Sequence, residues 1–261
     1  MEVIEVADPG DPRLDDFRDL MDADVRPDRR GIVIAEGLNV VTRLARSAYP
    51  MRAVIGVPKR IEALRWELAD REVPAYVCDK WTLSDVVGFR VTRGVLAAAS
   101  RPHPPDPQHL LATARCVVVL EGLNDFENLG ALFRNAAAFG IDAVVLDQTC
   151  ADPLYRRSVR VSMGHVLRVP FAVLPGAWPD ALEQVKRHGL RLLAMTPREE
   201  ADDLRALPAP PRWALMLGAE GPGLSEGALD AADQLVRIPM AGGVDSLNVA
   251  TAGAVAFSYL T

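Results

Sequence analysis

Residues 116–147 read CVVVLEGLNDFENLGALFRNAAAFGIDAVVLD, and this stretch decides the fold of the chain. Two continuous apolar runs, at 116–121 and 142–147, flank a helical stretch that closes at Gly140, a residue type favoured just after a helix. Short apolar runs of this kind are typical of parallel strands covered on both faces. Four more runs follow: LRVPF at 167–171, RLLAMT at 191–196, WALMLG at 213–218 and LVRIPM at 235–240. We therefore predict a parallel α/β sheet in the second half of the chain.

A smaller α/β pattern precedes this region. Strands are expected in GIVIAEG, RAVIGV, PAYVCD and GVLAAAS, with helices over Leu38–Ala48 and Pro58–Arg71. The stretch SRPHPPDPQ at 100–108 holds four prolines, which fix the backbone and favour an extended linker. The predicted organisation is a first domain at 1–101, whose leader at 1–28 forms a short helix or stays mobile, a linker at 102–109 and a second domain at 110–261.

The charge of the chain is unevenly distributed, although its net value is −6. Residues 1–28 hold ten Asp and Glu against three Arg, whereas residues 29–111 hold thirteen Lys and Arg against eight acidic residues. A basic module behind an acidic leader leaves room for a polyanionic partner such as nucleic acid. A solvated basic face is the ordinary alternative for such a module.

Membrane and metal proteins fit the sequence poorly. No apolar run reaches the length of a membrane span, and the acidic start is the opposite of a secretory signal. Cys78, Cys116 and Cys150 lack metal-ligand spacing and are expected to be reduced thiols in a cytoplasmic protein. The histidines show no ligand spacing either, so no metal is predicted; they are His103, His109, His165 and His188.

Three polar, glycine-rich loops follow predicted strands. They are GLNDFEN with Arg134 and Asn135 in the next helix, GAEGPG around Glu220, and MAGGVDSLN before a very apolar last helix. Because the carboxyl ends of parallel strands meet at one edge, the loops should converge on one site. Each has an ordinary alternative: Asn128, Asp245 or Ser246 as a helix cap, Arg134 as an exposed cation, and GAEGPG as a turn. No dinucleotide fingerprint or P-loop is present.

The same stretches carry three motifs of a known family. NLGALFRNAAAFG at 128–140 keeps every fixed position of N-x-G-A-x-x-R-x-A-x-x-F-G, LGAEGPGL matches L-G-x-E-x-x-G-[LM], and IPMAGGVDSLNV matches I-P-M-x-G-x-V-[DE]-S-L-N-V. In this order they resemble the SpoU (TrmH) family of RNA ribose 2′-O-methyltransferases, within the SPOUT superfamily. The resemblance covers residues 112–261, and residues 29–101 resemble, less specifically, a ribosomal-protein-like RNA-binding domain. Phe126-Glu127, Ala250 and His165 depart from common family residues.

The resemblance implies a catalytic domain that ends in a deep trefoil knot and binds S-adenosylmethionine. The implied cofactor-binding residues are Leu217, Gly218, Glu220, Gly221, Ile238, Met240, Ser246 and Leu247. Gly242 and Gly243 are then expected to allow turning and close backbone approach. Ser246 and Asn248 are expected to face the methyl donor and the ribose, and not only to cap the last helix.

The implied catalytic residues are Arg134, Asn128, Glu220, Ser246 and Asn248. Since a guanidinium hardly loses its proton, we expect Arg134 to bind the reacting phosphate-ribose unit and to stabilise alkoxide charge, with the general base left open. Arg156, Arg157 and Arg160 are candidate RNA-phosphate contacts, with a solvated face as the alternative.

The resemblance further implies a homodimer through the knotted domain and an RNA substrate, with 23S or other rRNA favoured and tRNA as the runner-up. Two rival functions remain open. One is a non-catalytic RNA-binding protein that keeps the fold, and the other is a nucleotide-dependent metabolic enzyme, against which the missing fingerprint argues.

Overall fold

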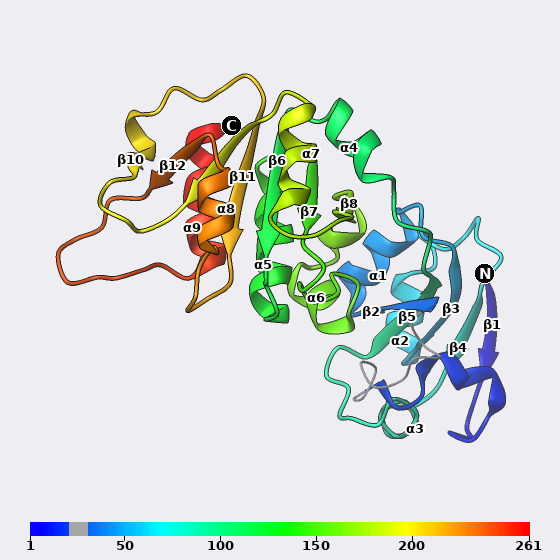
Figure 1. The fold of residues 1–261 in the computed structure, drawn as a ribbon. Helices are drawn as coiled ribbons and strands as arrows, with labels where there is room; N and C mark the ends of the chain where they lie inside the picture. Colours follow the sequence, from blue (N-terminus) through cyan, green and yellow to red (C-terminus); the bar gives the residue numbers. More distant parts are fainter. Residues whose placement is uncertain (21–30) are drawn as a thin grey trace. The chain divides into compact units, whose positions relative to one another are not determined.

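The computed structural model describes residues 1–20 and 31–261, so the end of the predicted leader, residues 21–28, lies outside the described residues. The chain divides into two compact units (Figure 1). The first comprises Met1–His103 together with Pro153–Leu167, and the second comprises Pro104–Asp152 together with Arg168–Thr261. Sequence alone assigned all of 110–261 to one domain, whereas the contacts group Pro153–Leu167 with the first unit.

The first unit is built on a five-stranded sheet. Its order is β1 (Glu2–Glu5), β4 (Pro74–Val77), β3 (Met51–Gly56), β5 (Val95–Ser100) and β2 (Ile32–Glu36). β1, β4 and β3 are parallel, whereas β5 pairs antiparallel with both β3 and β2. The four strands predicted after residue 30 are therefore confirmed, and the leader contributes β1 as an edge strand.

The helices of the first unit are short. They are α1 (Leu38–Ala45), α2 (Pro58–Ala63), α3 (Lys80–Val87) and α6 (Arg156–Val161), with 3-10 turns η1 (Pro12–Phe17) and η4 (His165–Leu167). α1 and α2 end earlier than predicted, and α3 was not predicted. Asp79 caps α3 through the amides of Trp81 and Thr82, and Gly88 ends it in the left-handed region.

The described part of the leader belongs to the core of the first unit. Leu14 and Phe17 of η1, and Leu20 after it, are fully buried. They pack in one cluster with Leu83 of α3 and Ile55 of β3. Of the two expectations for the leader, the described part fits the short helix, as the 3-10 turn η1, whose apolar side chains pack it against the sheet.

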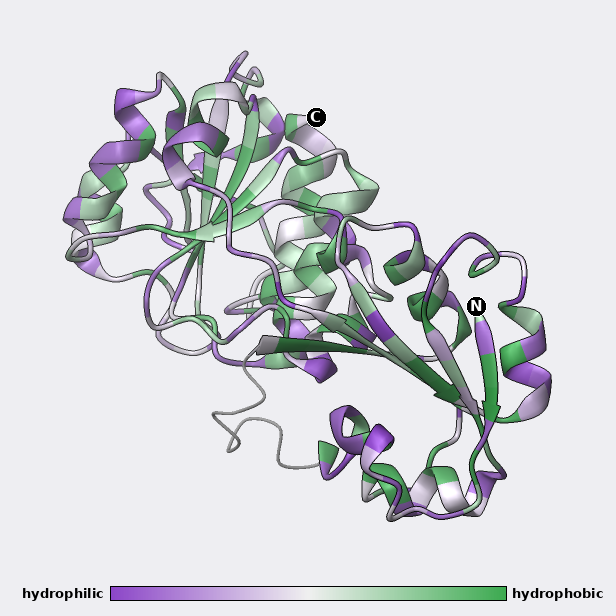
Figure 2. Cartoon of the chain, turned by 90° about the vertical axis from the view of Figure 1, so that its right-hand side faces the viewer, coloured by the Kyte–Doolittle hydropathy of each residue, from purple (hydrophilic) through white to green (hydrophobic). Residues whose placement is uncertain are grey.

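The second unit is built on a seven-stranded sheet in which every recorded pairing is parallel. Its order is β10 (Asp202–Asp203), β12 (Gln234–Arg237), β9 (Arg191–Met195), β11 (Trp213–Gly218), β6 (Cys116–Glu121), β7 (Ala143–Leu146) and β8 (Phe171–Val173). The central strands β11, β6 and β7 are strongly hydrophobic (Figure 2), as expected for strands covered on both faces, whereas the edge strand β10 consists of two aspartates. The predicted parallel α/β sheet is confirmed.

Helices cover this sheet. They are α4 (Pro107–Thr113), α5 (Phe126–Ala138), α7 (Glu183–Arg187), α8 (Glu226–Ala231) and α9 (Val249–Leu260), with 3-10 turns η5 (Asp180–Leu182) and η6 (Leu204–Ala206). Gly140 follows α5 with φ +69°, as predicted. α9 packs on α5, where Asn135 Nδ2 donates to the Ala250 carbonyl at 2.9 Å. None of the helices in the described ranges is long and apolar enough to cross a membrane.

Two sequence predictions in this unit were wrong in detail. LRVPF is not a strand: Leu167 ends the turn η4, and β8 begins only at Phe171, after Pro170, whose missing N–H cannot join a ladder. The proline-rich linker is shorter than predicted, because Pro107 takes the first position of α4 and Asp106 caps it through the Gln108 amide.

Candidate active site

Three loops meet at the carboxyl edge of the second sheet. They follow β6, β11 and β12, and the parallel pairing of the strands between them brings their ends to the same side. The turn after β11 is very tight: a Cβ on Gly218 would collide with the backbone of Gly223 and Leu224. Gly221 and Gly223 both have positive φ, so this loop needs glycine at these positions.

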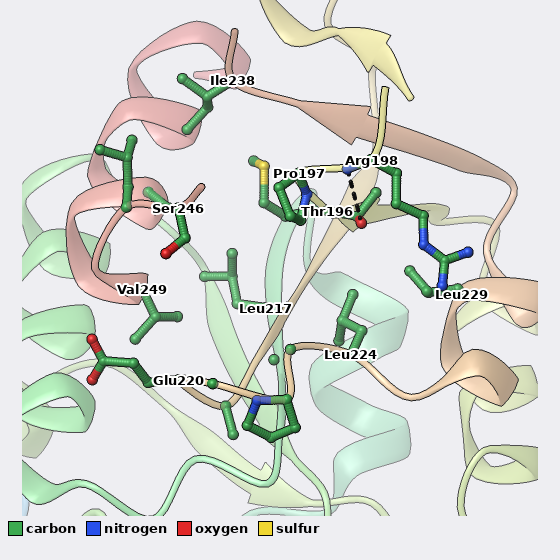
Figure 3. A pocket seen from close by; sticks show the side chains of 18 of the residues that line it. Thr196, Pro197, Arg198, Leu217, Glu220, Leu224, Leu229, Ile238, Ser246 and Val249 are labelled. Carbon is green, nitrogen blue, oxygen red and sulfur yellow. Dashed lines mark hydrogen bonds between the residues drawn. The ribbon is translucent and has the colours of Figure 1, made fainter. Parts of the chain in front are cut away.

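A cavity of about 350 Å³ lies between the loops after β11 and β12 and the segment after β9 (Figure 3). All eight residues expected to bind a cofactor line it: Leu217, Gly218, Glu220, Gly221, Ile238, Met240, Ser246 and Leu247. Its walls are mostly apolar side chains and glycine backbone. Figure 3 shows Glu220 and Ser246 near Val249 on one side of the cavity, and Arg198 on the opposite side. The structure thus brings all the residues expected to bind the cofactor together around one cavity. The identity of the ligand that occupies this cavity stays a prediction.

A chain of hydrogen bonds connects this cavity to two helices. Asn128 Nδ2 donates to Glu220 Oε2 at 2.9 Å, and Asn248 Nδ2 donates to Asn128 Oδ1 at 2.7 Å. Asn248 Oδ1 in turn accepts from the amides of Ala250 and Thr251 in the first turn of α9. Asn128 is buried, so both ends of its amide are used inside the protein. Its position in the first turn of α5 is not a cap, because Asp125 caps that helix.

The start of α9 has two features that the sequence left open. Asn248 is both the cap of the helix and a donor to Asn128, so the cap and site interpretations hold together. Gly243 has φ +83°, which confirms its turning role, whereas a Cβ on Gly242 would meet nothing within 4 Å. A Cβ on Gly243 would likewise meet no described atom within 4 Å, so the pair makes no close approach to the described protein, and its approach to a ligand stays a prediction.

Arg134 lies apart from the other predicted catalytic residues. It is exposed on α5 and does not line the cavity. An α-helix turns about 100° per residue, so Asn128 and Asn135, seven residues apart, share the face toward α9, and Arg134 points elsewhere. Within one chain the structure joins Asn128, Glu220 and Asn248 directly, with Ser246 lining the same cavity, and leaves Arg134 outside.

One wall of the cavity was missed by the sequence analysis. Met195 ends β9 and Thr196, Pro197 and Arg198 follow it, whereas Glu226 and Leu229 belong to α8. Arg198 forms an ion pair with Glu226, and its amide bonds Thr196 Oγ1 at 3.4 Å. The only available signal was that β9 ends at the same sheet edge, but the sequence did not show that β9 lies between β12 and β11.

The three arginines predicted to contact RNA lie on α6, in the first unit. Arg156 Nη1 donates to Glu36 Oε2 at 2.8 Å, and its guanidinium lies 4.4 Å from the centre of the Phe89 ring. Arg160 lies 3.9 Å from the same Glu36 oxygen. Glu36 is 3% exposed, so Arg156 is committed to neutralising a buried carboxylate.

Comparison with known proteins adds to this geometry. Residues 115–258 match the model of the SpoU rRNA Methylase family. The chain is 51% identical over 263 residues to an "Uncharacterized tRNA/rRNA methyltransferase" of Mycobacterium tuberculosis, covering 98% of this chain and 91% of the relative. It is 32% identical over 154 residues to the 23S rRNA (guanosine(2553)-2′-O)-methyltransferase of Bacillus subtilis, covering 59% and 61%.

Solved structures show the same fold. An rRNA methyltransferase of Sinorhizobium meliloti with bound AdoMet has a TM-score of 0.82 at 23% identity, covering 99% of this chain and 97% of that one. The AviRb methyltransferase of Streptomyces viridochromogenes, also with AdoMet, has a TM-score of 0.79 at 21% identity, covering 96% and 97%. At these identities the likeness concerns the fold.

Proposed function

The chain belongs to the SpoU rRNA Methylase family, and we propose that it transfers a methyl group from S-adenosylmethionine to a ribose 2′-hydroxyl of RNA. The observation that carries this proposal is the cavity lined by the two glycine-rich loops after β11 and β12, whose Glu220 is hydrogen-bonded to the pair of Asn128 and Asn248. Two relatives support this proposal. The name of the mycobacterial protein gives tRNA or rRNA as the substrate of methyl transfer, and that of the Bacillus subtilis protein gives the 2′-oxygen of 23S rRNA.

The cavity fits S-adenosylmethionine. Its volume of about 350 Å³ lies at the lower end of small-molecule sites, which suits a compactly folded nucleoside. Leu217, Ile238 and Met240 offer apolar surface for a purine, and the glycine backbone after β11 offers amides and carbonyls to its polar edge. The carboxylate of Glu220 complements a cationic ligand. Once bound, this donor supplies an electrophilic methyl group on a sulfonium, which is a good leaving group.

The protein must bring a ribose hydroxyl to that methyl group and favour loss of its proton. Asn128 holds Glu220 by one carboxylate oxygen, which leaves Oε1 able to accept from a ligand hydroxyl or amine. Asn248 fixes Asn128 from the other side, so the group is oriented before a ligand arrives. Ser246 lines the same cavity and can donate or accept at its rim. Arg134 binds the phosphate next to the reacting ribose and stabilises developing negative charge.

A homodimer accounts for the distant position of Arg134. Val244, Leu247 and Tyr259 are exposed near and on α9, as expected of a surface that a second copy covers. Within each copy α9 threads through a loop of earlier chain, which forms the knot, and in the dimer Arg134 of one copy serves the cavity of the other. Mixing two inactive variants, Arg134→Ala and Gly218→Ala, should then restore activity through hybrid dimers. Mixed samples as inactive as each variant alone would contradict this arrangement.

The reaction is tested with RNA from cells that lack the gene. Purified protein and radioactive donor should label that RNA, and the label should stay in dinucleotides resistant to alkali, because a methylated 2′-oxygen cannot attack its phosphate. Arg134→Ala should reduce turnover by roughly two orders of magnitude or more while donor affinity stays unchanged. Label released as single nucleotides would show base methylation instead.

The first unit, with its basic residues 29–101, is proposed as the domain that binds the RNA substrate in the cytoplasm. Ribosomal RNA is favoured because of the Bacillus subtilis relative, with tRNA as the alternative. Phosphate contacts by this module predict an RNA affinity that falls steeply as salt rises. A dissociation constant insensitive to salt would argue against this placement.

A further inference from the structure

The first unit holds an open groove that is separate from the cavity described above. It has a volume of about 870 Å³ and lies between α2, with the turns that follow it, and the edge strand β1. β1 pairs with β4 so that Val3 stands opposite Ala75 and Glu5 opposite Val77. Val3, Glu5 and Val77 line the groove from the sheet side.

Trp66 lines the other side of this groove and is 87% exposed, and Val3 is 57% exposed. The neighbouring Leu64 and Leu68 are fully buried, and the Leu68 amide donates to the Leu64 carbonyl at 3.0 Å. The buried leucines fix this turn, so the indole between them is held toward solvent. Leaving so large an apolar ring in water costs free energy, which a ligand can recover by covering it.

The charged residues of the groove indicate the class of ligand. Lys59 and Arg65 offer cations beside the indole, and Glu5 and Glu62 offer carboxylates. Arg65 lies 3.4 Å from Glu62 in an exposed pair, 67% and 72% exposed, which is weak and free to exchange partners. The cores of protein–protein interfaces are depleted of charge, so this lining fits a polar, planar ligand better than a second protein.

We propose that this groove binds unpaired nucleotides of the RNA substrate, with one base stacked on Trp66. An aromatic platform beside cations is the usual means of holding single-stranded nucleic acid, since every base has a flat face and every nucleotide a phosphate. Lys59 and Arg65 then contact phosphates, and the carboxylates accept from exocyclic amino groups of bases. This inference rests on the proposed function, because it takes RNA as the substrate.

Trp81 provides a matched control. It is 82% exposed at the start of α3 but is not among the residues that line the groove. Trp66→Ala and Trp81→Ala therefore remove the same ring from two exposed positions of one unit. Trp66→Phe keeps an aromatic face in place and tests whether stacking, and not the indole N–H, is needed.

The experiment measures binding of the full chain to labelled single-stranded RNA of about 12 nucleotides by fluorescence anisotropy. A second probe of equal length carries abasic sites, which keep the phosphates and remove the bases. Trp66→Ala should weaken binding of the first probe roughly 5- to 100-fold and leave the abasic probe unchanged. Trp66→Phe should retain most of the affinity, and Trp81→Ala should match the wild type.

Unchanged binding by Trp66→Ala, or equal loss on both probes, would overturn the inference. The inference would also fail if Trp66→Ala binds RNA as the wild type does but has a smaller mass in solution than the wild type. That result would show that the groove binds protein. The proposed function is judged separately, by methyl transfer and donor calorimetry with the wild type. If RNA binds through Trp66 but no RNA is methylated, the proposed reaction fails and the groove assignment stands.

Discussion

Asn128 Nδ2 lies 2.9 Å from Glu220 Oε2, and this bond joins residues 92 positions apart in the chain. It connects the first turn of α5 to the glycine loop after β11, so the carboxylate at the cavity is fixed by a buried amide. Asn128 accepts from Asn248 at the same time, so hydrogen bonds connect the loop, α5 and the start of α9. The position of Glu220 should depend on the polarity of this amide.

Asn128→Asp tests that polarity. Two carboxylates would then face each other, and donor affinity should fall roughly 10- to 100-fold at about pH 8 through loss of a charge-assisted hydrogen bond. Close carboxylates raise the pKa of one of them, so protonation restores a donor and the relative affinity should recover as the pH falls. Calorimetry with S-adenosylmethionine across the pH range measures this.

A second substitution serves as the control for this bond. In Asn128→Asp with Glu220→Gln the donor and acceptor are exchanged, so the hydrogen bond can form again with no like-charge contact. Fixation of the loop should be regained, and the double variant should bind the donor better than Asn128→Asp alone. A double variant that binds more weakly than either single variant would show that the bond is not what positions residue 220.

The sequence predicted which residues belong to this site better than it predicted the hydrogen bonds between them. Apolar runs predicted β6, β7, β9, β11 and β12, because strands buried on both faces must be apolar throughout. The motifs placed Glu220 and Asn248 near each other, but Asn128 could equally have been a helix cap. Nothing local showed that Asp125 takes that role and frees Asn128 to bond Glu220.

Long-range pairing explains what could not be predicted. Strand order is a property of the whole sheet, so the wall formed by Thr196 and Arg198 had no local signal. Arg156 of the first unit pairs with Glu36, 120 residues away, and the spacing of the arginines within the chain gives no hint of that partner. Local errors had local causes, as where Pro170 delays the start of β8.

Two substitutions of Asn248 should distinguish its contribution to stability from its contribution to donor binding. Asn248→Asp keeps an oxygen that accepts from the amides of Ala250 and Thr251, and a negative charge is favourable at a helix start. It removes the Nδ2 donor to Asn128, so donor affinity should fall while the melting temperature stays close to that of the wild type. Asn248→Ala removes both contacts and should also cost about 1 kcal/mol of unfolding free energy. Equal melting temperatures for the two variants would contradict this separation.

Gly218→Ala should weaken donor binding strongly. Its new methyl group would collide with the backbone of Gly223 and Leu224, so the turn after β11 would have to open. Gly242→Ala is the matched control, because a Cβ there meets nothing within 4 Å and the residue does not line the cavity. Calorimetry with S-adenosylmethionine should show loss of roughly tenfold or more for Gly218→Ala alone, as expected when a close-packed turn is overfilled. Wild-type affinity in both variants would argue against this loop as the cavity wall.

Arg212 is expected to hold the second unit together at the end opposite to the site. Its guanidinium donates to the carbonyls of Leu111, Ala114 and His188 at 3.0, 2.9 and 2.7 Å, where α4 and α7 end. These carbonyls have no partner within their helices, and Arg212→Ala would leave them unsatisfied, lowering the free energy of unfolding by about 2 kcal/mol. The melting temperature should then fall by about 4–8 °C. Arg187→Ala is the control, because that side chain is 72% exposed and its ion pair with Glu183, at 3.6 Å, is exposed too. It should change the melting temperature by less than about 2 °C.

Arg212→Lys should not restore the melting temperature, because one ammonium cannot reach carbonyls that a planar guanidinium spans. Equal melting temperatures of Arg212→Ala and Arg187→Ala would contradict this prediction. They would show that water replaces the hydrogen bonds of Arg212 without lowering the free energy of unfolding.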